Sequence, residues 1–405
     1  MRIVGLFAGI GGIETGFRAA LGEAAHTELL CEWWPPAQRV LAARFGEVPL
    51  HPDVRELREL PAGIDVLAAG FPCTDLSQAG RTAGITGGQS GLVGHVFEAL
   101  RLTATRRRRL PWLVIENVPN MLSLDRGQAM RYLVGELEAL GYRWAYRVVD
   151  SRFTGVPQRR RRVLLVASAD HDPREVLFAD EASAMVETGQ HAEDAYGFYW
   201  TEGRSGLGWA RDAVPTLKGG STLGIASPPA VWVPGAPPGR RLVTPQIEDA
   251  EALQGFARGW TAPAEDAPRR NGPRWKLVGN AVTVGVARWL AGRIAEPGEV
   301  LPLPSESWSG SRSWPTAAWG ERGQVWRMAA SEYPRLEPYR HLLDVMDAET
   351  APALSHRAAA GFLGRLQRGN LGRHPGFRED VARHVELTEP RGAGLAAEAA
   401  WTGGR

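Results

Sequence analysis

The sequence predicts an α/β protein with a doubly wound, mostly parallel sheet, a smaller loop-rich domain and a helical C-terminal extension. Residues 1–170 alternate short apolar runs with segments of helical periodicity, which is typical of a parallel sheet covered by helices on both faces. Residues 171–238 are irregular and rich in Gly, Pro and Ser, which indicates a separate module. Residues 296–315 form a connector rich in Pro, Ser and Trp, and helical spacing of apolar residues follows it.

The elements of the first 170 residues follow from their apolar runs. Predicted strands are residues 3–7, 28–31, 66–69, 113–115, 144–149 and 163–167. Predicted helices, in which apolar residues recur every three to four positions, are residues 14–21, 36–45, 92–105 and 128–140. Residues 71–91 carry five glycines and little periodicity, so we expect a long functional loop there. Helical spacing returns at residues 247–256 and 282–294.

Length and composition limit the class of protein. The 405 residues, 44% of them hydrophobic, suffice for two or three folded domains. The expected domains are residues 1–169 with 272–295, residues 170–271, and residues 296–405. No apolar run is long enough to span a membrane. Because the two cysteines are far apart, we expect neither a disulfide framework nor a metal site, and a reducing cytoplasm fits the chain.

The net charge of +2 conceals an arginine-rich composition, since 45 of the 47 basic residues are arginine. GC-rich coding explains this bias without reference to function. Arginine nevertheless suits phosphates and base edges, and the runs at residues 106–109 and 159–162 suggest an anionic partner. Charge by itself does not establish nucleic-acid binding.

A glycine-rich loop follows the first predicted strand, where α/β sheets bind nucleotides. Phe7, Gly9 and Gly11 form an F-x-G-x-G pattern, and Glu14 stands where a dinucleotide-binding loop has its third glycine. A carboxylate there is a poor neighbour for a pyrophosphate. The loop alone is compatible with a nucleotide site or with an ordinary tight turn.

Acidic and apolar residues further along the chain favour a nucleoside without phosphates. Glu32 can accept hydrogen bonds from both ribose hydroxyls, and Trp33 can stack on an adenine. Asp53 can serve the adenine amino group and Val54 its face. Each residue alone is commonly a solvated acid or a half-buried side chain. Their occurrence at successive strand ends is what indicates a ligand.

Cys73 follows the strand at residues 66–69 and opens the glycine-rich loop. Most lone cysteines are inert and buried, and we expect this of Cys31 inside its strand. A thiol at the carboxyl end of a parallel strand is accessible to ligands, so Cys73 is a candidate nucleophile. The carboxylate of Glu116, after the strand at residues 113–115, should reach the same edge.

Two further motifs supply polar groups. In the arginine run, strand alternation sends Arg160 and Arg162 to one side and Arg159 and Arg161 to the other, so one pair should face the cleft. Asn280 is expected near the N-cap of the helix that begins around residue 282, where a structural role suffices to explain it.

Together these motifs resemble the cytosine-5 DNA methyltransferase family. The resemblance covers residues 1 to about 295 and is specific because many short blocks occur in the family's order. The blocks are Phe7-x-Gly9-x-Gly11, Glu32-Trp33, Pro72-Cys73, Glu116-Asn117-Val118, Gln158-x-Arg160-x-Arg162, Thr216-Leu217, Leu253-Gln254-Gly255-Phe256 and Gly279-Asn280-x-Val282. The chain departs from the family's pattern in the loop after Cys73, where Leu76 replaces a frequent aromatic residue.

The resemblance implies a Rossmann-like methyltransferase fold, S-adenosylmethionine as cofactor with S-adenosylhomocysteine as product, and a cytosine flipped out of double-stranded DNA. It assigns catalytic roles to Cys73, Glu116, Arg160 and Arg162. It assigns cofactor binding to Phe7, Gly9, Gly11, Glu32, Trp33, Asp53, Val54, Leu92, Asn280 and Val282. In this scheme Cys73 attacks C6 of the base, Glu116 serves N3 and the exocyclic amine, and Arg162 holds O2.

The resemblance also implies an enzyme of the bacterial restriction-modification type. Residues 170–271 would form the target-recognition domain, and double-stranded DNA would be the partner of a monomeric, nucleoid-associated protein with no membrane contact. A cognate restriction endonuclease encoded nearby would need no stable complex with it. Three alternatives stay open: an RNA cytosine-5 methyltransferase, a non-catalytic regulator and a dinucleotide oxidoreductase. The regulator would be expected to lack Cys73 or Glu116, and Glu14 disfavours the oxidoreductase.

Residues 301–405 lie beyond the family resemblance. Their tryptophans and helical spacing favour a helical appendage packed on the catalytic domain. The alternative is direct contact with DNA phosphates through Arg365, Arg368 and Arg373.

Overall fold

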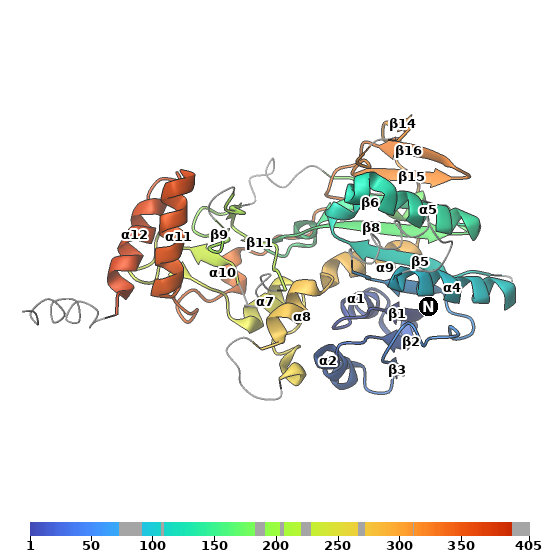
Figure 1. Ribbon diagram of the computed structural model, residues 1–405, viewed down its shortest axis with the longest axis horizontal. Helices are drawn as coiled ribbons and strands as arrows, with labels where there is room; N and C mark the ends of the chain where they lie inside the picture. Colours follow the sequence, from blue (N-terminus) through green and yellow to red (C-terminus); the bar gives the residue numbers. More distant parts are fainter. Residues whose placement is uncertain are drawn as a thin grey trace, which may run out of the picture.

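The structure, a computed structural model, describes residues 1–72, 91–106, 109–182, 191–202, 206–219, 228–265, 272–310 and 312–390. It contains a ten-stranded sheet with helices and, at the other end of the molecule, a four-stranded sheet (Figure 1). The predicted α/β class with a smaller second domain is confirmed.

One half of the large sheet is parallel. Its strands are β1 (Arg2–Leu6), β2 (His26–Cys31), β3 (Leu50–His51), β4 (Val66–Ala69) and β5 (Trp112–Asn117). The helices of this half are α1 (Gly12–Leu21), α2 (Pro35–Phe45) and α4 (Leu92–Arg106). Because the strands are parallel, the residues that follow β1, β2, β4 and β5 all lie at one edge of the sheet.

The other half is antiparallel. It consists of β6 (Arg143–Asp150), β8 (Arg161–Ser168), β14 (Ser305–Ser307), β15 (Ala317–Glu321) and β16 (Gln324–Met328). The full order is β14-β16-β15-β6-β8-β5-β4-β1-β2-β3. The strand at 163–167 is therefore present as β8 but reversed against β5. The segment between β6 and β8 holds only η4 (Ser151–Thr154) and β7 (Gln158–Arg159), too little chain for a crossover helix.

Apolar side chains alternate between the two faces of the large sheet. In β4, Val66 and Ala68 pack on the face covered by α1 and α9 (Val284–Ala295). Leu67 and Ala69 pack on the opposite face, against α4 and α5 (Gln128–Ala139). Both faces are thus buried, which explains why these strands are continuous apolar runs in the sequence. The predicted helices in this part of the chain are confirmed.

The small sheet forms the core of the second module. Its strands are β9 (Tyr196–Phe198), β10 (Ala210–Arg211), β12 (Ala230–Trp232) and β13 (Leu242–Val243), in the order β10-β9-β12-β13. The linking elements are β11 (Val214–Pro215), which pairs with β7, and helices α7 (Ile247–Leu253) and α8 (Arg274–Asn280). Helix α6 (Arg174–Leu177) packs with α9 on the large sheet. Short 3-10 turns are η1 (Gly22–Ala24), η2 (Pro119–Leu122), η3 (Leu124–Gly127) and η6 (Ala262–Ala264).

The residues after 300 divide between the two sheets. Strands β14 to β16 extend the large sheet, and Trp314 packs there against Trp144 and Tyr146. Helices α10 (Leu342–Val345), α11 (His356–Gly369) and α12 (Phe377–Thr388) lie at the other end of the molecule, where α11 and α12 cover the small sheet (Figure 1). The tryptophans pack on the large sheet as expected, but the expectation that the helices pack there too is wrong.

Candidate active site

A pocket opens at the edge where the parallel strands end, with a volume of about 220 Å³. Its walls are formed by residues that follow β1, β2 and β3 and by the start of α4. The lining residues are Phe7, Cys31, Glu32, Trp33, Asp53, Val54, Arg55 and Leu92. Six residues that the sequence predicted for one ligand therefore meet in one cavity, which we call the first pocket.

The glycine loop passes one side of the first pocket in a left-handed conformation. Phe7, Gly9 and Gly11 have φ angles of 56°, 57° and 79°. Gly11 also lies against Phe45, and a Cβ atom at Gly11 would come within 2.2 Å of that ring. A side chain at this position is thus excluded by both backbone conformation and space.

Glu32 links the loop to β2. Its carboxylate accepts hydrogen bonds from the backbone N–H groups of Gly9 and Trp34, both at 2.9 Å. Burial raises the pKa of Glu32 above its ordinary value, and the hydrogen bonds from these N–H groups offset only part of that rise. Trp33 beside it is 69% exposed, which is unusual for so large an apolar ring and leaves its face free for stacking.

Arg55 was not anticipated in this pocket. Its guanidinium donates to both oxygens of Asp53 at 2.9 and 3.0 Å, and this pairing lowers the pKa of Asp53. In the sequence, the one feature that relates Arg55 to this pocket is its position two residues after Asp53. Cys31 also reaches the wall, but burial and the charges of Glu32 and Asp53 raise the pKa of its thiol to about 12. Cys31 is therefore not a nucleophile near neutral pH, as the sequence predicted.

A second pocket, of about 250 Å³, lies at the ends of β4 and β5. Its lining residues are Gly70, Phe71, Pro72, Glu116, Asn117, Val118, Arg162, Gly279 and Asn280. The rings of Phe7 and Phe71 meet edge to face with centroids 6.3 Å apart. Since Phe7 lines the first pocket and Phe71 the second, the two cavities adjoin.

A buried ion pair dominates the second pocket. Nε of Arg162 lies 2.8 Å from Oε1 of Glu116. Burial lowers the pKa of Arg162, and the charge of Glu116 opposes that shift. Asn117 fixes the neighbouring wall, because its side-chain amide donates to the carbonyl of Phe71 and its Oδ1 accepts from the N–H of Val118. The pocket thus offers a carboxylate and a guanidinium on a rigid frame.

Arg160 does not line this pocket. Its guanidinium is fully buried and donates to the carbonyls of Leu217, Gly279 and Ala281 at 2.7 to 3.1 Å. Strand alternation correctly places it on the same side as Arg162 but cannot tell which of them reaches a cavity. Arg160, which stands just before β8, instead connects the start of that strand to the segments around Leu217 and around residues 279–281.

Asn280 is the last residue of α8, and Thr283 is the N-cap of α9. The expected position of Asn280 near a helix N-cap is therefore wrong. A short helix begins after Pro273 and ends at Asn280, so Asn280 faces the second pocket rather than the first. Val282 lies apart from both linings, with its carbonyl against Gly12.

Several predicted features lie outside the described residues. These are Cys73, the rest of the loop at residues 73–90, and residues 107–108 of the first arginine run. Among the described residues, no group of three or more His, Cys, Asp or Glu side chains could hold a metal ion. No helix in the described part of the chain has the length and apolarity needed to cross a membrane.

Glu14 in α1 is 2% exposed, and its Oε2 finds no hydrogen-bond partner among the described residues. Burial raises the pKa of Glu14 from 4.5 to about 7. At pH values between 4.5 and 7 the Glu14 carboxyl is protonated in the folded chain but ionised in the unfolded chain. The free energy of unfolding should therefore fall as the pH rises from 4.5 to 7. We expect Glu14→Gln to stabilise the protein by roughly 3 kcal/mol at pH 8 and little at pH 4.5. Melting temperatures of both proteins across this range test the shift, and parallel profiles would contradict it.

Comparisons with known proteins agree with this architecture. The family model for C-5 cytosine-specific DNA methylase matches residues 1–195. The chain is 45% identical to the type II methyltransferase M2.BsuMI of Bacillus subtilis (strain 168) over 376 residues, which cover 91% of this chain and 94% of that protein. It is 27% identical to the type II methyltransferase M.MspI of Moraxella sp, over 73% of this chain and 70% of that protein.

The crystal structure of S. pombe Dnmt2 methyltransferase has the same fold. It superposes with a TM-score of 0.53 at 16% sequence identity and covers 73% of this chain and 98% of that one. At this identity the likeness concerns the fold alone. The sequence match to M2.BsuMI extends over nearly the whole length of both proteins, and with the matching family model it shows that the chain belongs to the C-5 cytosine-specific DNA methylases and is a DNA cytosine-5 methyltransferase.

Proposed function

We propose that this enzyme transfers a methyl group from S-adenosylmethionine to C5 of a flipped-out cytosine in a specific double-stranded DNA sequence, through a covalent adduct with Cys73. The observation that carries the proposal is the pair of adjoining pockets, joined by the contact of Phe7 with Phe71. One pocket suits a nucleoside and the other suits a polar base edge. Methyl transfer requires the two ligands to lie side by side.

The first pocket suits the nucleoside part of S-adenosylmethionine. Glu32 has oxygen lone pairs left for the ribose hydroxyls after accepting from Gly9 and Trp34. The exposed ring of Trp33 and the apolar side chains of Val54 and Leu92 fit the faces of an adenine. Bound there, the cofactor supplies an activated methyl group at its sulfonium centre.

The second pocket suits a cytosine. C5 is a poor nucleophile until a group adds to C6, and a cysteine thiolate is a good group for that addition. Glu116 can accept from the exocyclic amine and, when it carries a proton, donate to N3 as charge develops. Arg162 can donate to O2 while it stays paired with Glu116. After transfer, loss of the C5 proton allows the sulfur to leave and restores the free thiol.

Residues 170–271 supply target recognition in this proposal, and residues 1–169 with 272–295 supply catalysis. Thr216 to Gly219 pass directly behind the second pocket, since a Cβ atom on Gly219 would meet Oδ1 of Asn280 at 2.6 Å. Gln158 joins the same segment to α7, because its Oε1 accepts from the N–H of Leu217 and its Nε2 donates to the carbonyl of Leu253. A restriction-modification role follows from the type II relatives, with chromosomal DNA in the bacterial cytoplasm as the substrate.

The proposal is tested by methylation mapping. Plasmid DNA recovered after expression of the enzyme should show one methylated cytosine in a fixed sequence on bisulfite sequencing. Purified enzyme should transfer tritium from labelled S-adenosylmethionine to duplex DNA and not to tRNA. Transfer to tRNA alone would favour the RNA methyltransferase, and absence of transfer to either would contradict the proposal.

The two arginines at the start of β8 should differ in importance. Arg162 pairs with Glu116 inside the second pocket, whereas Arg161 pairs with Glu332 at the surface. We expect Arg162→Ala to lower kcat by roughly 10²-fold, as for loss of one charge-stabilising donor. We expect Arg161→Ala to change kcat less than about threefold, since exposed ion pairs contribute little. Steady-state kinetics, corrected for the folded fraction, test this, and equal losses would contradict the assignment of Arg162.

A further inference from the structure

Trp260 packs against the glycine loop but does not line the first pocket. Its indole N–H donates to the carbonyl of Ile10 at 2.9 Å. Its ring packs edge to face against Phe45, which also covers Gly11, and lies 5.3 Å from the ring of Phe256. Trp260 therefore contacts the loop directly at Ile10 and, through the ring of Phe45, supports Gly11, although it is about 250 residues away in the sequence.

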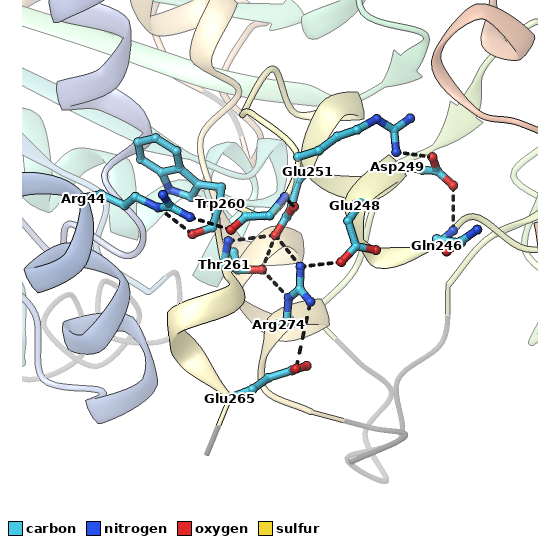
Figure 2. Close-up of polar contacts among 11 residues, drawn as sticks. Arg44, Gln246, Glu248, Asp249, Glu251, Trp260, Thr261, Glu265 and Arg274 are labelled. Carbon is cyan, nitrogen blue, oxygen red and sulfur yellow. Dashed lines mark hydrogen bonds and ion pairs between the residues drawn. The ribbon is translucent and has the colours of Figure 1, made fainter. Parts of the chain in front are cut away.

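The backbone around Trp260 is held on both sides. Glu251 in α7 accepts from the N–H of Gly259 at 2.5 Å and from the N–H of Thr261 at 2.8 Å (Figure 2). Arg44 in α2 donates to the carbonyls of Trp260 and Gly259, and its guanidinium lies 5.1 Å from the Trp260 ring centre. The indole has little freedom to turn away from Ile10.

Glu251 is itself fixed, because its side chain is completely buried and paired. Arg274, at the start of α8, donates to Glu251 at 3.0 Å and to Glu248 at 2.9 Å. It also donates to the hydroxyl of Thr261 (Figure 2). A buried charge of this kind is held in place by the cost of separating it from its partner. The network therefore joins α7, α8 and the segment of Trp260 into one unit.

The same unit reaches the second pocket. Gln254, just after α7, donates to the carbonyl of Val278 and accepts from the hydroxyl of Thr283, on either side of Asn280. The segment of α7 that is joined to Trp260 therefore also contacts residues on both sides of Asn280, which lines the second pocket.

We infer that Trp260 is a positioning residue that holds the glycine loop in its ligand-binding shape through the carbonyl of Ile10. This inference rests on the proposed binding of S-adenosylmethionine in the first pocket. Ile10 stands between Gly9 and Gly11, which both have positive φ, and glycine peptides of this kind turn easily. The peptide between Ile10 and Gly11 is held at both ends, because its N–H donates to the carbonyl of Ala8 at 2.8 Å and its carbonyl accepts from Trp260. Loss of the indole bond would leave this peptide with the Ala8 bond alone, next to Gly9, whose N–H orients Glu32.

The test is the full-length Trp260→Phe enzyme, which keeps an aromatic ring against Phe45 but has no N–H. We expect its Kd for S-adenosylmethionine, measured by calorimetry, to rise about tenfold, the effect of one lost hydrogen bond with a buried acceptor. The KM for DNA and the methylated sequence should not change, and kcat at saturating cofactor should stay within about twofold. The substitution would then weaken the binding of S-adenosylmethionine and leave DNA binding and the chemical step unchanged.

A matched control is Trp314→Phe, which removes an indole bond to the carbonyl of Gly127 far from both pocket linings. Trp314→Phe should lower the melting temperature by about as much as Trp260→Phe does, and it should leave the Kd for S-adenosylmethionine unchanged. If Trp260→Phe binds S-adenosylmethionine as tightly as the wild type, or if both variants lose affinity equally, the inference is wrong. Failure of the wild type itself to bind S-adenosylmethionine would instead overturn the proposed function.

Discussion

Cys73→Ala should abolish methyl transfer, with a loss of roughly 10⁴-fold or more, as for removal of other catalytic nucleophiles. Without addition to C6, C5 of the cytosine has almost no nucleophilic character, and none of the described residues that line the second pocket can replace a thiolate. Binding of the cofactor and of duplex DNA should persist, because neither ligand depends on the thiol for docking. Tritium transfer measures the rate, and calorimetry and gel-shift titration measure the two affinities.

Covalent trapping separates the chemical step from binding. On DNA that carries 5-fluorocytosine at the target, the wild type should form an adduct that survives denaturing gels, because no C5 proton can leave. Cys73→Ala should form none. Cys31→Ala is the control. The Cys31 thiol is buried and has a pKa of about 12, so the variant without it should still form the adduct. Because Cys31 lines the first pocket, this variant can differ from the wild type in its KM for the cofactor. Substantial turnover by Cys73→Ala would refute the covalent mechanism.

Removal of residues 355–405 should destroy sequence-specific DNA binding. Helices α11 and α12 bury Phe362 and Phe377 against Phe198 of the small sheet, with ring centroids 5.1 Å apart in both contacts. Burying each such side chain stabilises by about 1.5 to 3 kcal/mol, so loss of several exceeds what a module of this size can tolerate.

Polar contacts strengthen the same interface. Asp380 in α12 accepts from the indole N–H of Trp232 at 2.8 Å and pairs with Arg241. Arg365 in α11 donates to the carbonyls of Trp200 and Glu202. The truncated chain should therefore keep cofactor binding, because the first pocket is lined by residues between Phe7 and Leu92, and should lose specific methylation. Cofactor calorimetry, DNA titration and bisulfite sequencing on one preparation measure all three.

A point variant tests the packing without a truncation. Phe377→Ala should cost about 3 to 5 kcal/mol of stability in this module. Arg373→Ala, at an exposed position, is the control and should cost little. A truncated enzyme that is stable and still methylates the same sequence would show that the helices are dispensable. A stable truncated enzyme with weaker, less salt-dependent DNA binding would indicate phosphate contacts through Arg368 and Arg373 instead.

The parallel half of the sheet and the first pocket were predictable from the sequence because local rules determine them. Apolar runs of three to five residues predict its strands except β3, and parallel strands bring the residues after them to one edge. Glu32 and Glu116 each directly follow or end such a run. The second pocket was predictable for the same reason, as far as its acid and its position are concerned.

Other features depend on contacts between distant segments, which local patterns do not contain. The apolar spacing of α11 and α12 predicts helices but not the surface that they cover. Alternation along the arginine run gives the side of Arg160 but not the three carbonyls to which it donates. Trp260 had no feature in the sequence that linked it to Ile10. In each case the partner lies more than 50 residues away.

The division of residues 301–390 between the two sheets also determines when each domain can become complete during synthesis. Helix α9 must pack on α1, which was made about 270 residues earlier, and β15 must pair with β6. The small sheet stays uncovered until α12, which ends at Thr388, has left the ribosome. Contacts this far apart in the chain make folding slow and leave apolar surface exposed in intermediates. The residues that line the first pocket all lie before residue 93, so they are synthesised well before α8, which contributes to the second pocket, and before α12, which completes the cover of the small sheet.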